Sequence, residues 1–265
     1  MFRKHAYRFF MLATAGLVLA SLLLVSSCTK KGETLLISVA SSLQNVFTEF
    51  KPAAEKASGH SIAFNFAGSG ALRGQIEQGA AVDVFVSASA HEMERLMAAV
   101  PVEAASLITF LGNGLVVIGP PDAVPVQDKA QLRDRIDGAR RFSIGDENTV
   151  PAGRYAEQAL QTLGLRQARE GRVLLANSVR QVLAYVETGA VEYGFVFSTD
   201  AKASGDQDKS ALVYAFADED ISDPIVYQAV VLERSLYPKG VRAFVQSLTS
   251  DGARSIFEAA GFRVP

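Results

Sequence analysis

The chain has 265 residues, with 26 lysines and arginines against 28 aspartates and glutamates and a formal net charge of −2. A nearly neutral chain without a basic cluster is a poor nucleic-acid binder, because such binding depends on neutralising phosphates, so we expect no nucleic-acid partner. One cysteine excludes an internal disulfide and a multi-thiolate metal site, and three histidines leave little for a histidine metal centre. Hydrophobic residues make up 49% of the chain, which is enough for a packed core.

Residues 1–28 have the three regions of a secretory signal, because basic residues precede an uncharged apolar run that ends in small residues. Val25-Ser26-Ser27 followed by Cys28 resembles a bacterial lipobox. We therefore predict a lipoprotein signal peptide over 1–27, lipidation of Cys28 and a polar tether over 28–34. The folded part would then work outside the cytoplasmic membrane, held to it by acyl chains. A short transmembrane anchor is the alternative, since the apolar run is near the lower limit for a span.

Short apolar runs alternate with amphipathic segments through the rest of the chain. Strands are expected at 34–40, 61–67, 82–87, 115–118, 142–145, 173–176, 193–197, 211–216 and 225–232. Helices are expected at 43–50, 71–78, 91–99, 151–163, 178–188, 240–248 and 252–260. This alternation predicts an α/β fold with mainly parallel sheets that are flanked by helices.

The two successive α/β series fit two lobes with a ligand cleft between them better than they fit a single domain. The chain is expected to cross to the second lobe near 109–114 and to return near 223–228. Lobe I would then comprise 35–111 plus 229–265, and lobe II would comprise 112–228. We expect the protein to be a monomer.

Four of the expected helix starts carry small or neutral residues. They are Ala40-Ser41-Ser42-Leu43, Ala67-Gly68-Ser69-Gly70, Val150-Pro151-Ala152-Gly153 and Asn177-Ser178-Val179-Arg180. A helix N-terminus exposes unpaired N–H groups and carries about half a positive charge, so several of them aimed at one point would bind an anion. Small residues let the backbone approach a ligand, and hydroxyls add donors. Taken singly, Ser42, Ser69 and Ser178 can equally be plain N-caps.

Enzyme and metal readings fit the sequence poorly. Gly68-Ser69-Gly70 is a near miss to a nucleophile elbow and lacks a suitable histidine with an acidic partner, which leaves a surface serine hydrolase as a remote alternative. The same loop lacks the Lys-Ser/Thr end of a phosphate loop. His91 with Glu92 and Glu94 is more typical of a solvated helix face than of a metal site. We therefore expect no catalysis, no cofactor and no direct metal-cation site.

Read together, these segments resemble the periplasmic molybdate-binding proteins of ABC transporters, from about Leu36 to Phe262. The motifs that carry the resemblance are Val39-Ala40-Ser41-Ser42-Leu43, Phe66-Ala67-Gly68-Ser69-Gly70, Ala81-Val82-Asp83-Val84-Phe85-Val86-Ser87-Ala88, Leu111-Gly112-Asn113-Gly114, Val150-Pro151-Ala152-Gly153-Arg154-Tyr155-Ala156, Ser178-Val179-Arg180 and Gly194-Phe195-Val196-Phe197-Ser198-Thr199-Asp200-Ala201. Their number, order and spacing make the resemblance specific.

The resemblance implies a type II periplasmic-binding fold that closes over molybdate or tungstate and delivers it to a membrane permease with its cytoplasmic ATPase. The implied donors to the oxyanion are the hydroxyls and amides of Ser42 and Ser69 and the backbone amides of Ala152 and Val179, with Ser41, Gly68 and Phe197 lining the pocket. A tyrosine usually stands in the family where this chain has Phe197, which keeps another small oxyanion or an organic anion open as the ligand. Arg180 is expected in a surface or lobe–lobe ion pair rather than on the anion.

Overall fold

The computed structural model describes residues 34–203 and 209–265. The chain divides into two units, 1–33 and 34–265, and all of the described residues lie in the second. The predicted signal peptide, the lipidation site Cys28 and all of the predicted tether except Thr34 lie outside the described residues. Within the described ranges, no helix has the length and apolar character needed to span a membrane.

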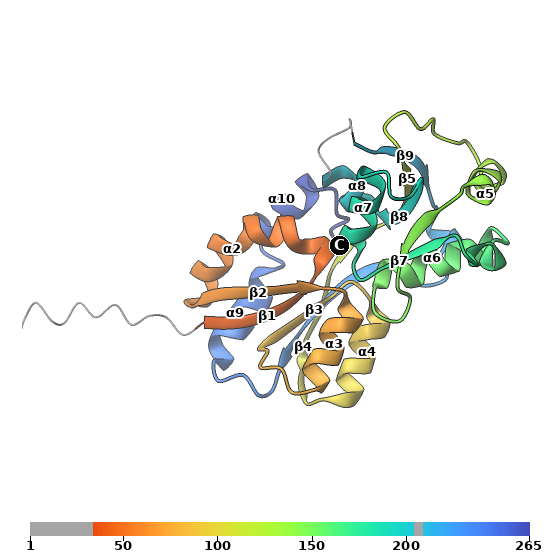
Figure 1. Ribbon diagram of the computed structural model, residues 1–265. Coiled ribbons are helices and arrows are strands. Elements are labelled where there is room, and N and C mark those ends of the chain that lie inside the picture. The colour runs from red at the N-terminus through yellow and green to blue at the C-terminus, as the bar shows by residue number, and fades with distance from the viewer. Residues whose placement is uncertain (1–33, 204–208) are drawn as a thin grey trace, which may run out of the picture. The chain divides into compact units, whose positions relative to one another are not determined.

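Strands and helices alternate along most of the described chain (Figure 1). The strands are β1 (Thr34–Ala40), β2 (Ser61–Ala67), β3 (Val84–Ser87), β4 (Val102–Gly112), β5 (Leu115–Gly119), β6 (Phe142–Gly145), β7 (Val173–Ala176), β8 (Tyr193–Phe197), β9 (Ala211–Ala215) and β10 (Val226–Leu232). The α-helices are α2 (Gln44–Ser58), α3 (Ser69–Glu77), α4 (Ala90–Ala99), α5 (Lys129–Gly138), α6 (Pro151–Thr162), α7 (Val179–Glu187), α8 (Ser198–Ala203), α9 (Pro238–Ser247) and α10 (Asp251–Ala259). Short 3₁₀ turns are η1 (Ser41–Leu43), η2 (Arg166–Arg169) and η3 (Asp218–Asp220).

The strands form two five-stranded mixed sheets, in the orders β2-β1-β3-β10-β4 and β7-β6-β8-β5-β9. In the first sheet β1 is parallel to β2 and β3, whereas β10 is antiparallel to β3 and β4. In the second, β6 is parallel to β7 and β8, whereas β5 is antiparallel to β8 and β9. Four strands in each sheet therefore share one direction, which confirms the predicted mainly parallel sheets. We call the first sheet with its helices lobe I and the second lobe II.

The reversed strand of each sheet is the one that follows a crossing between the lobes. The chain leaves lobe I at the end of β4 and enters lobe II at β5, and it returns between β9 and β10. All of β10 pairs within lobe I, beginning with Val226 opposite Gly112. Residues 226–228, which the sequence assigned to lobe II, therefore lie in the sheet of lobe I.

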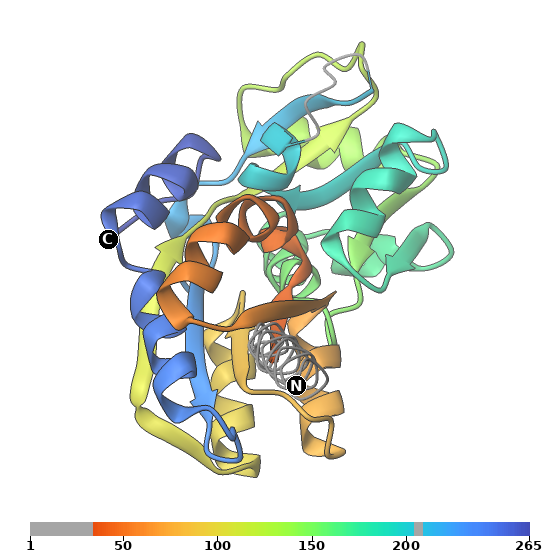
Figure 2. The ribbon, with the colours of Figure 1, turned by 90° about the vertical axis from the view of Figure 1, so that its left-hand side faces the viewer.

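Helices cover both faces of the lobe I sheet. Helices α2, α9 and α10 pack together on one face, and α3 and α4 pack together on the other (Figures 1 and 2). Successive residues of β3 alternate between the two faces, so Val84 and Val86 join the core that contains Phe47 of α2, whereas Phe85 joins Leu72 of α3. Burial of both faces explains why the strands read as continuous apolar runs rather than as an alternation of polar and apolar residues.

In lobe II, helices α6 and α7 pack against the parallel strands β6 and β8. A Cβ atom at Gly194 of β8 would lie 2.8 Å from a side-chain carbon of Val186 and 2.9 Å from one of Val182, so α7 packs closely only because this residue is glycine. A Cβ at Gly153 of α6 would lie 2.1 Å from the carbonyl oxygen of Gly145. Glycines therefore allow α6 and α7 to pack closely against the strands of lobe II.

Two long elements and one short helix were not predicted. Strand β4 is an edge strand whose first nine residues include only one buried residue, so its sequence lacks a strong apolar signal. Helix α5 buries only Leu132 and Ile136, and Asp128 caps it by accepting a hydrogen bond from the N–H of Gln131. Helix α8 has only six residues. Helix α3 begins at Ser69, two residues before the predicted start, with Gly68 as its N-cap.

Candidate functional site

The four turns singled out in the sequence follow neighbouring parallel strands. In lobe I, Ala40 at the end of β1 lies opposite Ala67 at the end of β2. In lobe II, Gly145 at the end of β6 lies opposite Ala176 at the end of β7. Because neighbouring parallel strands end at one edge of a sheet, each lobe places two of the turns side by side, where open α/β folds bind ligands.

The turns of the two lobes meet. The N–H of Gly70 donates a hydrogen bond to the carbonyl oxygen of Thr149, 2.9 Å away in the other lobe. A Cβ at Gly68 would lie 2.6 Å from that oxygen and 3.3 Å from the carbonyl oxygen of Asn177. Turn η1 also contacts α7. The start of α3 therefore lies against the turns that precede α6 and α7, and glycine is needed there for the backbones to approach.

Every residue predicted to line the anion site is buried at this contact. They are Ser41, Ser42, Gly68, Ser69, Ala152, Val179 and Phe197. Ser69 and Ala152 are 0% exposed and Ser42 is 6% exposed. An anion from solvent can reach these residues only when the lobes separate. The structure thus gathers the predicted residues between the lobes, and their contact with a ligand stays a prediction.

The N-cap alternative holds for only one of the three serines. Ser178 caps α7, because its side chain accepts a hydrogen bond from the N–H of Gln181 at 3.2 Å. Ser69 is instead the first residue of α3, and its Oγ accepts from the N–H of Ala88 at 3.1 Å. Ser42 makes no cap bond, and its Oγ lies 3.1 Å from the hydroxyl of Tyr227. The hydroxyls of Ser42 and Ser69 therefore do not serve as N-caps.

The contact of Ser69 also bears on the hydrolase alternative. A nucleophilic serine needs a base that accepts its proton, and the atom that bonds Ser69 Oγ is an amide N–H, which can only donate. His60, one of the two described histidines, packs its ring 5.1 Å from that of Tyr237. The geometry around Ser69 gives no support to nucleophilic catalysis.

A polar network at the crossing between the lobes was missed by sequence reasoning. Asn113 follows β4 and donates from Nδ2 to the hydroxyl of Tyr227 at 3.0 Å and to Thr199 Oγ1 at 2.8 Å. Its Oδ1 accepts from the N–H of Gly114 at 2.9 Å and from Ser198 Oγ at 2.7 Å. This single side chain ties β10 of lobe I to α8 of lobe II. The sequence offered one clue to this network, which is Tyr227 within an apolar strand, because a buried phenol needs a hydrogen-bond partner.

Phe197 lies between two buried tyrosines. Its ring centroid is 6.1 Å from that of Tyr155 and 6.1 Å from that of Tyr227. Burial raises the pKa of Tyr155 to about 12 and raises that of Tyr227 further, so both hydroxyls keep their protons at neutral pH. The Tyr155 hydroxyl donates to the carbonyl oxygen of Pro224 at 3.3 Å, whereas the Tyr227 hydroxyl is directed at Ser42.

Arg180 pairs within lobe II, not at the surface or across the lobes as expected. Its Nε lies 3.4 Å from Oδ1 of Asp200, whose side chain is 0% exposed. Burial raises the pKa of Asp200 from its ordinary value of 3.8 to about 7, and the nearby Arg180 opposes the shift. Neither carboxylate oxygen has a hydrogen-bond partner in the part of the chain that the structure describes. Burial therefore penalises the ionised form of Asp200.

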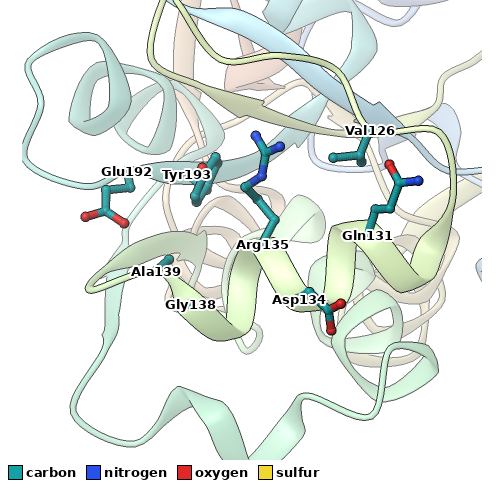
Figure 3. Close-up of a pocket in the computed structure, with 8 residues that line it drawn as sticks. All are labelled: Val126, Gln131, Asp134, Arg135, Gly138, Ala139, Glu192 and Tyr193. Atoms are coloured by element: carbon teal, nitrogen blue, oxygen red, sulfur yellow. The ribbon is translucent and has the colours of Figure 1, made fainter.

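Two features outside the contact between the lobes bear on other possible sites. Residues 34–203 and 209–265 contain no group of three or more histidine, cysteine, aspartate or glutamate side chains placed to hold a metal ion. A hollow of about 540 Å³ lies beside α5, lined in part by Asp134, Arg135 and Glu192. Figure 3 shows that Asp134 and Glu192 point away from each other, so these two carboxylates do not converge on one point in the hollow.

Two α/β lobes that meet at helix starts define a binding protein of the periplasmic type. Residues 35–263 match the family described as bacterial extracellular solute-binding proteins, and the chain belongs to this family. Within it, the chain is an ABC transporter substrate-binding protein related to periplasmic molybdate-binding proteins, which confirms the resemblance inferred from the motifs. Solute binding is the activity that the family description states.

The comparisons cover nearly the whole described chain. It is 33% identical over 266 residues to YvgL of Bacillus subtilis (strain 168), named as an ABC transporter substrate-binding lipoprotein, with 99% of each chain covered. It is 33% identical over 231 residues to the molybdate-binding protein ModA of Escherichia coli (strain K12), with 86% of each covered. The solved periplasmic molybdate-binding protein of Azotobacter vinelandii superposes with a TM-score of 0.76 at 24% identity, covering 87% of this chain and 99% of that one. This last likeness shows the type II fold.

Proposed function

We propose that this protein captures molybdate, and also tungstate, between its two lobes and delivers it to a membrane permease driven by a cytoplasmic ATPase. The observation that carries the proposal is the burial of two serine hydroxyls together with the starts of α3, α6 and α7 where the lobes meet. The relation to ModA proteins supports the choice of ligand, and the ABC transporter family supports the permease as partner.

The chemistry of such a site suits a fully ionised oxyanion. Molybdate carries no proton at neutral pH, so all of its oxygens accept hydrogen bonds and neutral donors alone can satisfy it. Helix N-termini supply N–H groups and a positive potential without a counter-ion. Burial between the lobes excludes water and strengthens each hydrogen bond. Selection against sulfate, which has the same charge, would rest on the size of the closed cavity.

Calorimetric titration of the purified protein with molybdate, tungstate, sulfate and phosphate tests the proposal. We expect molybdate and tungstate to bind much more tightly than the other two anions. Ser69→Ala should weaken molybdate binding by about 10- to 100-fold, because a hydrogen bond to a charged group contributes about 1.5–3 kcal/mol. Ser38→Ala is the matched control, since Ser38 is also buried but its hydroxyl has no partner among the described residues. Binding of sulfate or phosphate without molybdate would show that the ligand assignment is wrong.

A different small oxyanion or an organic anion is the second candidate ligand. It is favoured by Phe197, which is 1% exposed and stands where the family usually has a tyrosine donor. The same titration extended to other oxyanions and to small carboxylates separates the two candidates. Tighter binding of one of these than of molybdate would favour the second.

We also propose that the protein is a monomer, exported and anchored to the membrane by lipid on Cys28. The position of the single cysteine directly after Val25-Ser26-Ser27 supports the lipid anchor, as does the lipoprotein name of the relative YvgL. Cells grown with a labelled fatty acid should label the wild-type chain but not Cys28→Ala. Equal labelling of both chains would refute the anchor.

A further inference from the structure

The amide of Asn113 has only one orientation compatible with its neighbours. A backbone N–H can only donate, so the atom of Asn113 that faces the N–H of Gly114 at 2.9 Å must be Oδ1. The Nδ2 group then points to Tyr227 and Thr199. Because Nδ2 carries protons and has no acceptor capacity, the oxygen of Tyr227 must accept from it.

The next question is which group accepts the hydrogen bond that the Tyr227 hydroxyl donates. The residue is 0% exposed, so bulk water cannot take the proton, and Ser42 Oγ lies 3.1 Å from the hydroxyl. In either arrangement one of the two hydroxyl protons has no acceptor among the described residues, and only the proton of Ser42, which is 6% exposed at the contact between the lobes, can be accepted by a bound anion. Tyr227 therefore donates to Ser42.

The polarity thus runs from Asn113 through Tyr227 to Ser42. The oxygen of Ser42 accepts from Tyr227, and its own proton has no acceptor in the described part of the chain. Ser69 is in the same condition, because its oxygen accepts from the N–H of Ala88. The two serines of lobe I are held as donors by different partners, one a backbone amide and the other a relay of two side chains.

We propose that Asn113 and Tyr227 are positioning residues that hold Ser42 as a hydrogen-bond donor toward the ligand, so that the site favours an anion whose oxygens carry no protons. This inference rests on the proposed function and deepens it, since it concerns the class of anion that the site accepts. An oxyanion without protons satisfies Ser42 in any orientation. A protonated oxyanion loses affinity, because its proton needs an acceptor and the proposed contacts of the site are donors.

Tyr227→Phe tests the relay without a large change in volume. Removing the phenol oxygen frees Ser42 to rotate, so we expect molybdate affinity to fall about tenfold, the equivalent of one hydrogen bond. The ratio of affinities for selenate over arsenate, measured at about pH 6 where only arsenate is protonated, should fall at least fivefold. Tyr155→Phe is the matched control, because Tyr155 packs against the same Phe197 ring but its hydroxyl donates to a backbone carbonyl. This variant should leave the ratio within twofold.

A double-mutant cycle tests whether Tyr227 changes molybdate affinity through Ser42. If Tyr227 acts through Ser42, then Tyr227→Phe should change molybdate affinity by less than twofold in a chain that already carries Ser42→Ala. Additive losses in the cycle would overturn the relay. So would an unchanged selenate-to-arsenate ratio in a Tyr227→Phe protein that melts as the wild type does.

Failure of this inference is distinguishable from failure of the proposed function. A wild-type protein that binds another oxyanion and not molybdate would refute the ligand assignment, and the cycle would then be measured with that anion. The double-mutant cycle and the selenate-to-arsenate ratio decide the role of Tyr227, whichever anion the wild type binds.

Discussion

Alanine in place of Gly70 is expected to weaken molybdate binding by about 10- to 100-fold while each lobe stays folded. The added Cβ would lie 2.7 Å from Cα of Thr149 and 2.9 Å from the carbonyl oxygen of Asn148. These atoms belong to the backbone of the other lobe and cannot rotate away. Overpacking typically costs about 1–3 kcal/mol, and here that cost falls only on the state in which the lobes meet. The variant should therefore favour an open protein.

Gly74→Ala is the control for this experiment. Gly74 lies on the same helix, and a Cβ there would meet no atom within 4 Å. Both substitutions gain the same helix propensity, up to about 1 kcal/mol, so the difference between them isolates the clash with lobe II. Calorimetry with molybdate measures both variants. Equal affinities would mean that the contact between Gly70 and Thr149 is not needed for binding.

The second large effect concerns pH and Asp200. An acid whose pKa is about 7 when folded and 3.8 ordinarily keeps its proton in the native state while the unfolded chain has lost it. Between those values the native state binds more protons, so its stability falls as pH rises. A shift of about three units corresponds to about 4 kcal/mol, as an order of magnitude, when the pH reaches 7. Below about pH 4 both states are protonated and Asp200 makes no contribution.

Urea unfolding of the wild type and of Asp200→Asn measures this contribution. Asparagine does not titrate, so the free energy of unfolding of the wild type relative to the variant should decrease from about pH 4 to pH 7 and then level off. The substitution also removes a charge beside Arg180, which changes the free energy of unfolding of the variant. This change does not vary with pH through residue 200, because asparagine does not titrate. A relative stability that increases over this range would mean that the ion pair with Arg180 outweighs burial and holds Asp200 ionised.

The ligand proposal and the pH effect involve adjacent parts of lobe II. Val179 and Arg180 are consecutive at the start of α7, so the proposed amide donor and the buried ion pair share one turn of helix. An anion bound at Val179 would add negative charge near Asp200. That charge disfavours the ionised carboxylate further, so occupancy of the site should not lower the pKa of Asp200.

The sequence determined those elements whose signal is local. Strands β1, β2, β6, β7 and β8 agree with the prediction at both ends, because each is a short run rich in apolar residues and bounded by turn residues. The four small-residue turns were found for the same reason, since the strands that precede them and the helices that follow are both evident. Their order along the chain was enough to indicate the family and to nominate Ser42, Ser69, Ala152 and Val179.

The tertiary structure alone decided what depends on residues far apart in the chain. Ser42 and Tyr227 are separated by 185 residues, and they meet because β10 inserts antiparallel between β3 and β4. Nothing local in β10 indicates that order, since strand direction follows from where the chain crosses between lobes. Arg180 found its partner in a helix of six residues, too short for a periodic signal. Chain pattern thus specifies each segment, whereas hydrogen-bond partners and buried charges are set by how the segments pack.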